Sequence, residues 1–289
     1  MRLKNKSQVL MSTLVLFALS TFSIIWFLPV RVLSRFRIGL VINEGIQRSI
    51  YNVIRKVKVG NDFIYFHVVN RITQLRALTL MTKEPDTISW LRMLDCQDVL
   101  MDVGANIGVY TLFAAKCTDA KIIAIEPSFR NLDLLQRNLS LNKLQSRVLV
   151  APFALGSANH VGTFLLSQNG QQIGGALNTI VTHRHTSLNT SEYLQSQTLV
   201  FTASELISTF GLPTPTFVKI DVDGNELDVL HGFGDLLRDV KSVLIEVDQL
   251  QMKDGSAIEA LLSSYGFMKQ DLINGIRTRE NQIWLRRNT

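Results

Sequence analysis

The segment from residue 99 to residue 132 constrains the fold and the function of this chain more than any other. An apolar strand, Val99 to Val103, is expected to turn sharply through Gly104 to Gly108 into a helix, and a second apolar strand, Ile122 to Ile125, ends on the acid Glu126. Glycines at a turn let the backbone approach a bound ligand, which a Cβ would obstruct. An acid about 20 residues after such a turn can accept both hydroxyls of a ribose. The segment therefore predicts the front half of a nucleotide-type cofactor site.

The acid that precedes the turn distinguishes between cofactors. A dinucleotide site carries Gly-x-Gly-x-x-Gly, with a helix N-terminus that faces a pyrophosphate. This chain instead has Asp102, Gly104 and Gly108 in the pattern Asp-x-Gly-x-x-x-Gly. Asp102 would repel a pyrophosphate but can pair with an ammonium group. S-adenosylmethionine carries an amino-acid end and a ribose but no phosphate, so the pair of Asp102 and Glu126 favours it. The alternative is a tight strand-to-helix turn in an α/β protein that binds no ligand there.

Helices and strands are expected to alternate along the chain, which indicates a mostly parallel sheet covered on both faces. The 289 residues, of which 46% are hydrophobic, allow one α/β domain with an appendage. Strands are expected near residues 99–103, 121–126, 147–152, 216–221 and 242–248, and helices near 107–116, 129–140, 203–209, 224–238 and 255–264. At the end of the chain, Phe267 to Ile273 and Gln282 to Arg286 flank the turn-prone Asn274-Gly275 and predict an antiparallel hairpin.

Three further segments surround this alternation. Residues 61–70 are expected to add a strand, and residues 84–94 a helix, before the first strand of the sheet. The polar stretch from Ser157 to Gln197 separates the third and fourth strands. Ligands of open α/β sheets bind outside the carboxyl ends of the strands, so this insertion is a candidate substrate lid. The alternative is a disordered surface loop.

The N-terminal residues 1–30 are predicted to form a membrane anchor. No charged residue occurs from Ser7 to Val30, and the mostly apolar segment from Val9 to Leu28 is long enough as a helix to span roughly 30 Å of hydrocarbon. A cleaved signal peptide or a buried core helix is the alternative. The predicted organisation is an anchor (1–30), a basic juxtamembrane linker with pre-domain elements (31–94) and a globular domain (95–289). Because the cofactor is cytosolic, this single-pass membrane protein is expected to hold its globular domain in the cytosol.

The charge distribution argues against a nucleic-acid partner. Residues 1–60 hold ten Lys or Arg and one acid, so that 20 basic and 23 acidic residues remain from the totals of 30 and 24 for the rest of the chain. The globular part is therefore not basic, as a nucleic-acid footprint would require. Positive charge beside an apolar segment instead suits anionic lipid headgroups.

A second dense motif runs from Phe217 to Gly232. Its strand delivers Asp221 to the carboxyl end of the fourth strand, near the reactive end of a cofactor, and the chain then turns into a helix. Asp221 either orients an acceptor or only caps that helix. Glu226, in the first turn of the helix, suits a helix N-terminus at least as well as a functional role. Asp221 and Asp223 without further ligands do not predict a metal site.

Five motifs of the chain belong together: Asp-Val-Gly-Ala-Asn-Ile-Gly-Val-Tyr-Thr at 102–111, Ile-Glu-Pro at 125–127, Ala-Leu-Gly at 154–156, Lys-Ile-Asp-Val-Asp-Gly-Asn-Glu at 219–226 and Leu-Ile-Glu-Val at 244–247. In combination they resemble the FkbM family of S-adenosylmethionine-dependent methyltransferases. The resemblance covers about residues 95–286. It implies a Rossmann-like, seven-stranded class I methyltransferase fold, mostly parallel with a C-terminal antiparallel hairpin, here preceded by the N-terminal transmembrane helix. It also implies methylation of a hydroxyl on a sugar or natural product. Together with the predicted anchor, this leads us to expect a sugar, glycan, lipid-linked or natural-product acceptor at a membrane. The family's usual Asp-Val-Glu-Gly is Asp-Val-Asp-Gly here, with Asp223 in place of Glu, which makes the transfer of a substrate less safe.

Carried over position by position, the resemblance implies a site. The methionine end of S-adenosylmethionine would lie against Asp102, Gly104, Asn106 and Gly108, the ribose against Glu126, and the adenine against Phe153, Ala154 and Leu155. Asp221 would orient the acceptor hydroxyl, with a base among His183, His185 and His231. A cofactor-binding scaffold without catalysis is one alternative. An NAD-dependent dehydrogenase is disfavoured by the missing Gly-x-Gly-x-x-Gly, and a nucleic-acid methyltransferase by the missing basic face and Asn-Pro-Pro-Tyr segment.

Overall fold

The computed structural model describes residues 37–181, 192–247, 252–277 and 281–287. The chain divides into two compact units, Met1–Val53 and Ile54–Thr289. The described part of the first unit is helix α2 (Arg37–Tyr51). An ion pair between Glu44 and Arg48, which lie one turn apart, stabilises this helix. The site described below lies in the second unit.

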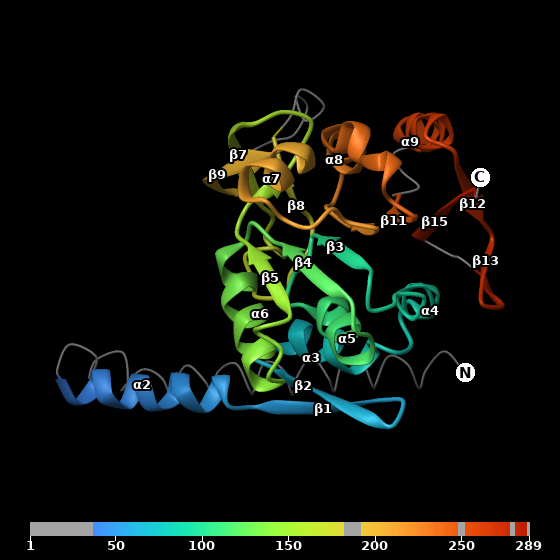
Figure 1. Cartoon of the computed structure of the whole chain (residues 1–289). Coiled ribbons are helices and arrows are strands. Elements are labelled where there is room, and N and C mark those ends of the chain that lie inside the picture. Colours follow the sequence, from blue (N-terminus) through green and yellow to red (C-terminus); the bar gives the residue numbers. More distant parts are fainter. Residues whose placement is uncertain (1–36, 182–191, 248–251, 278–280, 288–289) are drawn as a thin grey trace, which may run out of the picture. The chain divides into compact units, whose positions relative to one another are not determined.

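A seven-stranded sheet forms the centre of the second unit (Figure 1), in the order β12-β15-β11-β10-β3-β4-β5. Its strands are β3 (Val99–Val103), β4 (Lys121–Ile125), β5 (Val148–Ala151), β10 (Phe217–Ile220), β11 (Ser242–Glu246), β12 (Phe267–Gln270) and β15 (Asn281–Arg286). The five strands from β5 to β11 are parallel, and β15 is antiparallel to both of its neighbours. Every residue of β3 is buried, as expected for a parallel strand covered on both faces. The predicted sheet and its antiparallel end are confirmed.

Helices cover both faces of this sheet, each over its own apolar core (Figure 1). One core contains residues of α3 (Arg71–Thr79), α4 (Pro85–Leu91), α5 (Val109–Cys117) and α6 (Phe129–Leu141). The other contains residues of α7 (Ala203–Phe210), α8 (Glu226–Phe233), the 3-10 helix η3 (Gly234–Arg238) and α9 (Met252–Ser264). The helix expected at 84–94 is α4, and the one expected at 224–238 is divided into α8 and η3.

The insertion predicted as a polar lid or loop contributes two strands and the start of a third to a second sheet. Its strands, β6 (Ala154–Leu155), β7 (His160–Leu166), β8 (Asn178–Ile180) and β9 (Leu194–Phe201), lie in the order β6-β9-β7-β8. β7 can form a sheet strand because Phe164, Leu165 and Leu166 are buried. The polar and glycine-rich part of the insertion is the connection from β7 to β8. Residues 182–191 lie outside the described part.

Two small hairpins complete the second unit. β1 (Ile54–Val59) pairs with β2 (Asp62–His67), which is the strand expected in residues 61–70. β13 (Leu272–Ile273) pairs with β14 (Ile276–Arg277) around Asn274 and Gly275, whose φ angles are 49° and 78°. Positive φ at both central residues is typical of a two-residue type I′ turn. Asn274-Gly275 thus forms a smaller hairpin between the two strands that were expected to flank it, while β12 and β15 pair with each other.

The expected fold class is corrected in its membrane part. In the ranges that the structure describes, no helix is both long and apolar enough to cross a membrane. The predicted anchor, residues 1–30, lies outside those ranges. The transmembrane helix in the expected fold class, and the single-pass membrane location with a cytosolic domain, are therefore not supported by the structure.

Candidate functional site

The turn from β3 into α5 depends on two glycines with φ angles of 84°. A Cβ on Gly104 would lie 1.8 Å from the carbonyl oxygen of Asp221, at the end of the neighbouring strand β10. A Cβ on Gly108, the N-cap of α5, would lie 2.3 Å from Cδ1 of Leu135 on α6. Gly104 lines the cavity described below, whereas Gly108 does not. The glycines therefore allow close packing of the protein itself, and only the first also faces a ligand-sized space.

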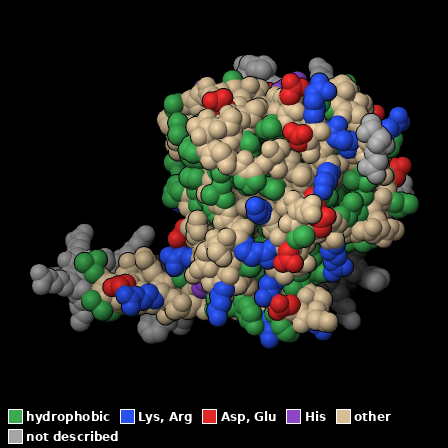
Figure 2. All heavy atoms as spheres, viewed as in Figure 1, with side chains coloured by type: hydrophobic (Ala, Val, Ile, Leu, Met, Phe, Trp, Pro, Cys, Tyr) green, Lys and Arg blue, Asp and Glu red, His purple; other side chains and the backbone are tan. Residues whose placement is uncertain are grey.

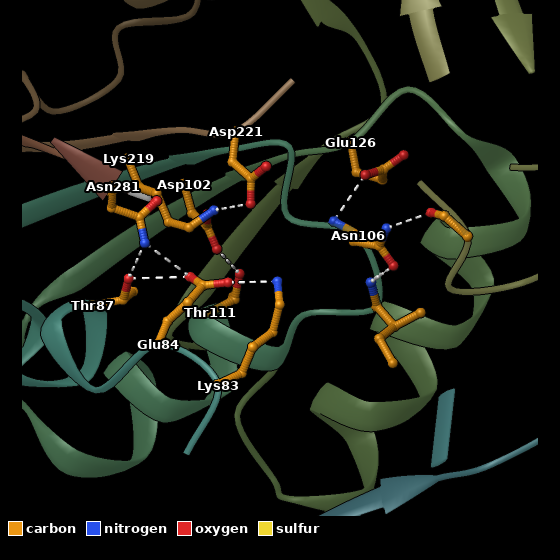
Figure 3. A network of polar contacts seen from close by, with 12 residues as sticks. Lys83, Glu84, Thr87, Asp102, Asn106, Thr111, Glu126, Lys219, Asp221 and Asn281 are labelled. Atoms are coloured by element: carbon orange, nitrogen blue, oxygen red, sulfur yellow. Dashed lines mark hydrogen bonds and ion pairs between the residues drawn. The ribbon is translucent and has the colours of Figure 1, made fainter. Parts of the chain in front are cut away.

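Glu126, directly after β4, forms a hydrogen bond with this turn (Figure 3). Its two carboxylate oxygens accept hydrogen bonds of 2.8 Å from the backbone N–H groups of Asn106 and Ser128. The carboxyl group is 5% exposed, and burial raises its pKa to about 7 although the two backbone donors oppose the shift. A carboxylate offers about four lone-pair sites. Glu126 therefore retains acceptor capacity toward the cavity that it lines.

Lys219 connects two acids of the cavity (Figure 3). This lysine is 2% exposed, and its Nζ lies 2.8 Å from Oδ2 of Asp221 and 3.7 Å from Oδ1 of Asp102. The hydroxyl of Thr111 donates to Oδ2 of Asp102 at 2.5 Å. Among the described residues, no group forms a hydrogen bond with the buried Oδ1 of Asp102. Asp102 thus lines the cavity with a buried oxygen that, within the described residues, has no hydrogen-bond donor and lies near the charge of Lys219.

Asp221 and Glu246 form a coupled pair of carboxyl groups at the ends of β10 and β11. Burial opposes the ionisation of Asp221, but the charge of Lys219 and a hydrogen bond from Glu246 outweigh it and lower the pKa of Asp221. The hydrogen bond to Asp221 and the negative charge of that residue raise the pKa of Glu246 to about 9. At neutral pH, Asp221 is therefore ionised and Glu246 is protonated.

A second group of polar residues comes from before the predicted domain (Figure 3). Glu84, which is 9% exposed, accepts hydrogen bonds from Nζ of Lys83 at 2.6 Å, Oγ1 of Thr87 at 3.1 Å and Nδ2 of Asn281 at 3.2 Å. Both Lys83 and Glu84 line the cavity. Sequence reasoning missed this group because residues 71–84 carry no recognisable motif.

The connection from β7 to β8 covers the site. Oδ2 of Asp223 accepts hydrogen bonds from the backbone N–H groups of Leu177 at 2.7 Å and Asn178 at 3.3 Å. Nδ2 of Asn106 donates to the carbonyl of Gly175 at 2.8 Å, and Nδ2 of Asn225 donates to Oγ1 of Thr179 at 2.6 Å. The connection is thereby attached to both predicted motifs.

One cavity joins most of the predicted site residues. Those that line it are Asp102, Gly104, Asn106, Glu126, Ala154, Leu155 and Asp221. Phe153 does not line the cavity, and its ring packs against that of Phe201 with centroids 5.0 Å apart. His231 is exposed on α8 and is not brought to the cavity. His183 and His185 lie outside the described residues.

The proposed helix-capping role of Asp221 does not match the structure. Helix α8 begins at Glu226 after the N-cap Asn225, so Asp221 lies too early in the chain to cap it. Glu226 accepts a hydrogen bond from the backbone N–H of Gly224 at 2.9 Å, which agrees with a role at the start of this helix.

Within the described residues, no three His, Cys, Asp or Glu side chains gather as a metal site requires.

Comparison with known proteins identifies relatives of this chain. A family model described as the methyltransferase FkbM domain matches residues 102–268. The hexuronic acid methyltransferase AglP of Haloferax volcanii is 29% identical over 150 residues, which are 52% of this chain and 56% of that protein. The methyltransferase sdnD of Sordaria araneosa is 29% identical over an alignment of 196 positions that covers 58% of this chain and 73% of that protein. This chain thus spans little more than half of the first relative.

Solved structures include similar chains. The crystal structure of a methyltransferase FkbM from Methylobacillus flagellatus is 17% identical, with a TM-score of 0.42, and the match covers 66% of this chain and 44% of that one.

Proposed function

Because the chain belongs to the FkbM methyltransferase family, we propose that it transfers the methyl group of S-adenosylmethionine to a hydroxyl of a sugar, glycan, lipid-linked or natural-product acceptor. The observation that carries the proposal is the single cavity that joins Asp102, Gly104 and Glu126 with Asp221 and Lys219. One relative is a hexuronic acid methyltransferase, which supports an acceptor of the sugar class.

The cavity residues fit S-adenosylmethionine. The unsatisfied Oδ1 of Asp102 suits the ammonium group of the methionine end, and the free acceptor capacity of Glu126 suits the ribose hydroxyls. Ala154 and Leu155 provide an apolar wall for the adenine. When bound, S-adenosylmethionine supplies an electrophilic methyl group on a sulfonium.

The residues at the ends of β10 and β11 would act on the acceptor. The ionised Asp221 can accept a hydrogen bond from an acceptor hydroxyl and thereby align its oxygen for an in-line displacement. The bond from the methyl carbon to the sulfonium sulfur would break as the hydroxyl oxygen bonds to that carbon, which would leave a neutral thioether, and Asp221 would take the hydroxyl proton. Lys219 fixes the orientation of Asp221, and the protonated Glu246 supports it from the other side.

A nucleic-acid acceptor has less support than a small-molecule or glycan acceptor. On the face in Figure 2, Lys and Arg side chains are interspersed with Asp and Glu side chains. The residues after position 60 include 20 basic and 23 acidic side chains. Binding to a phosphate backbone depends instead on clustered positive charge.

The test measures binding and transfer separately on the 289-residue chain. We expect calorimetry to detect binding of S-adenosylmethionine and of its demethylated product, but no binding of NAD. Labelled methyl groups should then pass from S-adenosylmethionine into a hydroxyl-bearing fraction when lipids, glycans and small molecules are offered separately. Binding without transfer to any fraction would support the non-catalytic scaffold, and binding of NAD alone would support the dehydrogenase.

A further inference from the structure

A wall of the cavity comes from outside the matched FkbM region. Residues 102–268 match the family model, but the cavity is also lined by residues of α3 and of the loop after it, namely Arg76, Thr79, Leu80, Lys83 and Glu84. Helix α4 separates these residues from β3 along the chain, and three of the five are charged. The wall therefore adds charge to the cavity that the family motifs do not supply.

Arg76 is fixed in this wall by its Nε. The Nε–H donates to the carbonyl of Gly174 at 2.5 Å, in the connection that covers the site. Helix α3 is itself fixed by a capping box between Asn70 and Thr73, and Nδ2 of Asn70 donates to the carbonyl of Ile173 at 2.8 Å. The bonds of Asn70 and Arg76 thus hold the helix against the same connection. A guanidinium braced through its Nε keeps its two terminal amino groups available for a ligand.

In the part of the chain that the structure describes, the guanidinium of Arg76 forms no ion pair with a carboxylate. Lys83 is paired with Glu84 at 2.6 Å, and Lys219 is paired with Asp221 at 2.8 Å. Among the described residues, no ion pair involves Arg76, although the cavity also contains Glu126, Asp221 and Asp223. Those three acids take hydrogen bonds from backbone N–H groups or from Lys219. Within the described residues, Arg76 therefore forms no direct ion pair, although its positive charge favours the ionised forms of Glu126, Asp221 and Asp223.

We propose that Arg76 binds a carboxylate carried by one of the two reactants. A planar guanidinium matches a carboxylate with two parallel hydrogen bonds. This inference rests on the proposed function, which supplies two sources of a carboxylate. One is the methionine end of S-adenosylmethionine, and the other is a carboxylate on the acceptor, as in a uronic acid. Both sources place a carboxylate in the same cavity, so the binding chemistry is shared.

The first arm of the test compares S-adenosylmethionine with its decarboxylated analogue. If Arg76 binds the methionine carboxylate, Arg76→Gln weakens the affinity for S-adenosylmethionine about tenfold to hundredfold and leaves that for the analogue unchanged. Arg76→Lys, which keeps the charge but loses the fork, gives a smaller loss. Arg71→Gln is the matched control, because Arg71 is exposed in the first turn of the same helix and does not line the cavity.

The second arm compares a methyl hexuronoside with the matching neutral methyl hexoside. If Arg76 binds an acceptor carboxylate, Arg76→Gln leaves the affinity for S-adenosylmethionine unchanged. The same variant lowers the affinity for the hexuronoside about tenfold or more relative to the affinity for the hexoside. Equal losses for both members of each pair would mean that Arg76 only holds the connection at Gly174, and would overturn the inference. No loss in either arm would overturn it too. If the unmodified chain does not bind S-adenosylmethionine, the proposed function itself fails.

Discussion

The floor and the roof of the cavity are built in different ways. The floor consists of the carboxyl ends of β3, β4 and β10 with the turn from Gly104 to Gly108, and it is set by the register of parallel strands. The roof is the connection from residue 167 to residue 177, and side chains from several distant elements hold it. Its attachments come from Asn70, Arg76, Asn106, Asn131 and Asp223. The floor thus depends on the core of the protein, whereas the roof depends on single hydrogen bonds.

This difference predicts how each part of the cavity responds to substitution. A change in the floor alters strand packing and therefore the fold, because β3 is completely buried. A change in one attachment of the roof removes one hydrogen bond, with a net effect of about 0.5–1.5 kcal/mol. The roof can therefore vary without loss of the fold. We infer that packing fixes the floor and that the roof, which we expect to contact the acceptor, tolerates single changes.

The largest expected effect is that of Gly104→Ala in the floor. The new Cβ would lie 1.8 Å from the carbonyl oxygen of Asp221, and the backbone has a φ of 84°. We expect the free energy of unfolding to fall by about 3 kcal/mol or more and binding of S-adenosylmethionine to be lost. Gly211→Ala is the control, because Gly211 has a φ of 59° with no atom within 4 Å of the added Cβ. Equal losses of stability in urea unfolding for both variants would show that the contact with Asp221 is unimportant.

The second prediction concerns Asp221 at the end of β10. If Asp221 aligns the acceptor hydroxyl, Asp221→Asn lowers kcat by about 10²-fold or more and changes the affinity for S-adenosylmethionine far less. Asp235→Asn is a matched control, because Asp235 is an exposed partner of Arg238 outside the cavity. Steady-state kinetics and calorimetry on both variants make the comparison. Near-normal turnover of Asp221→Asn would contradict a role in the reaction.

Most of the floor could be predicted from the sequence because its signals are local. The apolar run before Gly104, the acid Asp102 and the acid Glu126 all lie within one strand-turn-helix-strand unit. The reason given for the glycines was incomplete, since Gly108 packs against Leu135 and not beside the cavity. Such a contact joins α5 to α6 and leaves no pattern within either segment.

The roof and the wall from α3 could not be predicted because their contacts are distant in sequence. Arg76 reaches the carbonyl of Gly174 across 98 residues, and Asp223 reaches the N–H of Leu177 across 46. The polar residues of this region indicated a loop, while β7 and β9 form the sheet that supports it. His231 was a candidate by residue type alone, and its exposed position on α8 separates it from the cavity.

The third prediction is a pH dependence of methyl-donor binding that comes from Glu126. Because its pKa is about 7, the Glu126 carboxylate becomes protonated as the pH falls through 7. The proposed acceptor of hydrogen bonds from the ribose hydroxyls is then lost. For one group with this pKa, the ionised fraction falls about tenfold from pH 8 to pH 6. We expect the affinity for S-adenosylmethionine to fall by up to that factor. Calorimetry of Glu126→Gln should give weaker binding without this dependence, and an unchanged pH profile in that variant would assign the titration to another group.

The smallest expected effect is that of removing one attachment of the roof. Asp223→Gly deletes the carboxylate that accepts hydrogen bonds from Leu177 and Asn178, while glycine tolerates the φ of 55° at this position. We expect KM for the acceptor to rise about threefold to tenfold, as for one or two lost hydrogen bonds, with kcat and the affinity for S-adenosylmethionine nearly unchanged. Asp223→Asn keeps an oxygen acceptor and tolerates the same backbone conformation, so its KM should lie between those of Asp223→Gly and the unmodified chain. If Asp223→Gly instead weakens the binding of S-adenosylmethionine as strongly as that of the acceptor, the roof contributes to the binding of both reactants. The division between floor and roof would then be wrong.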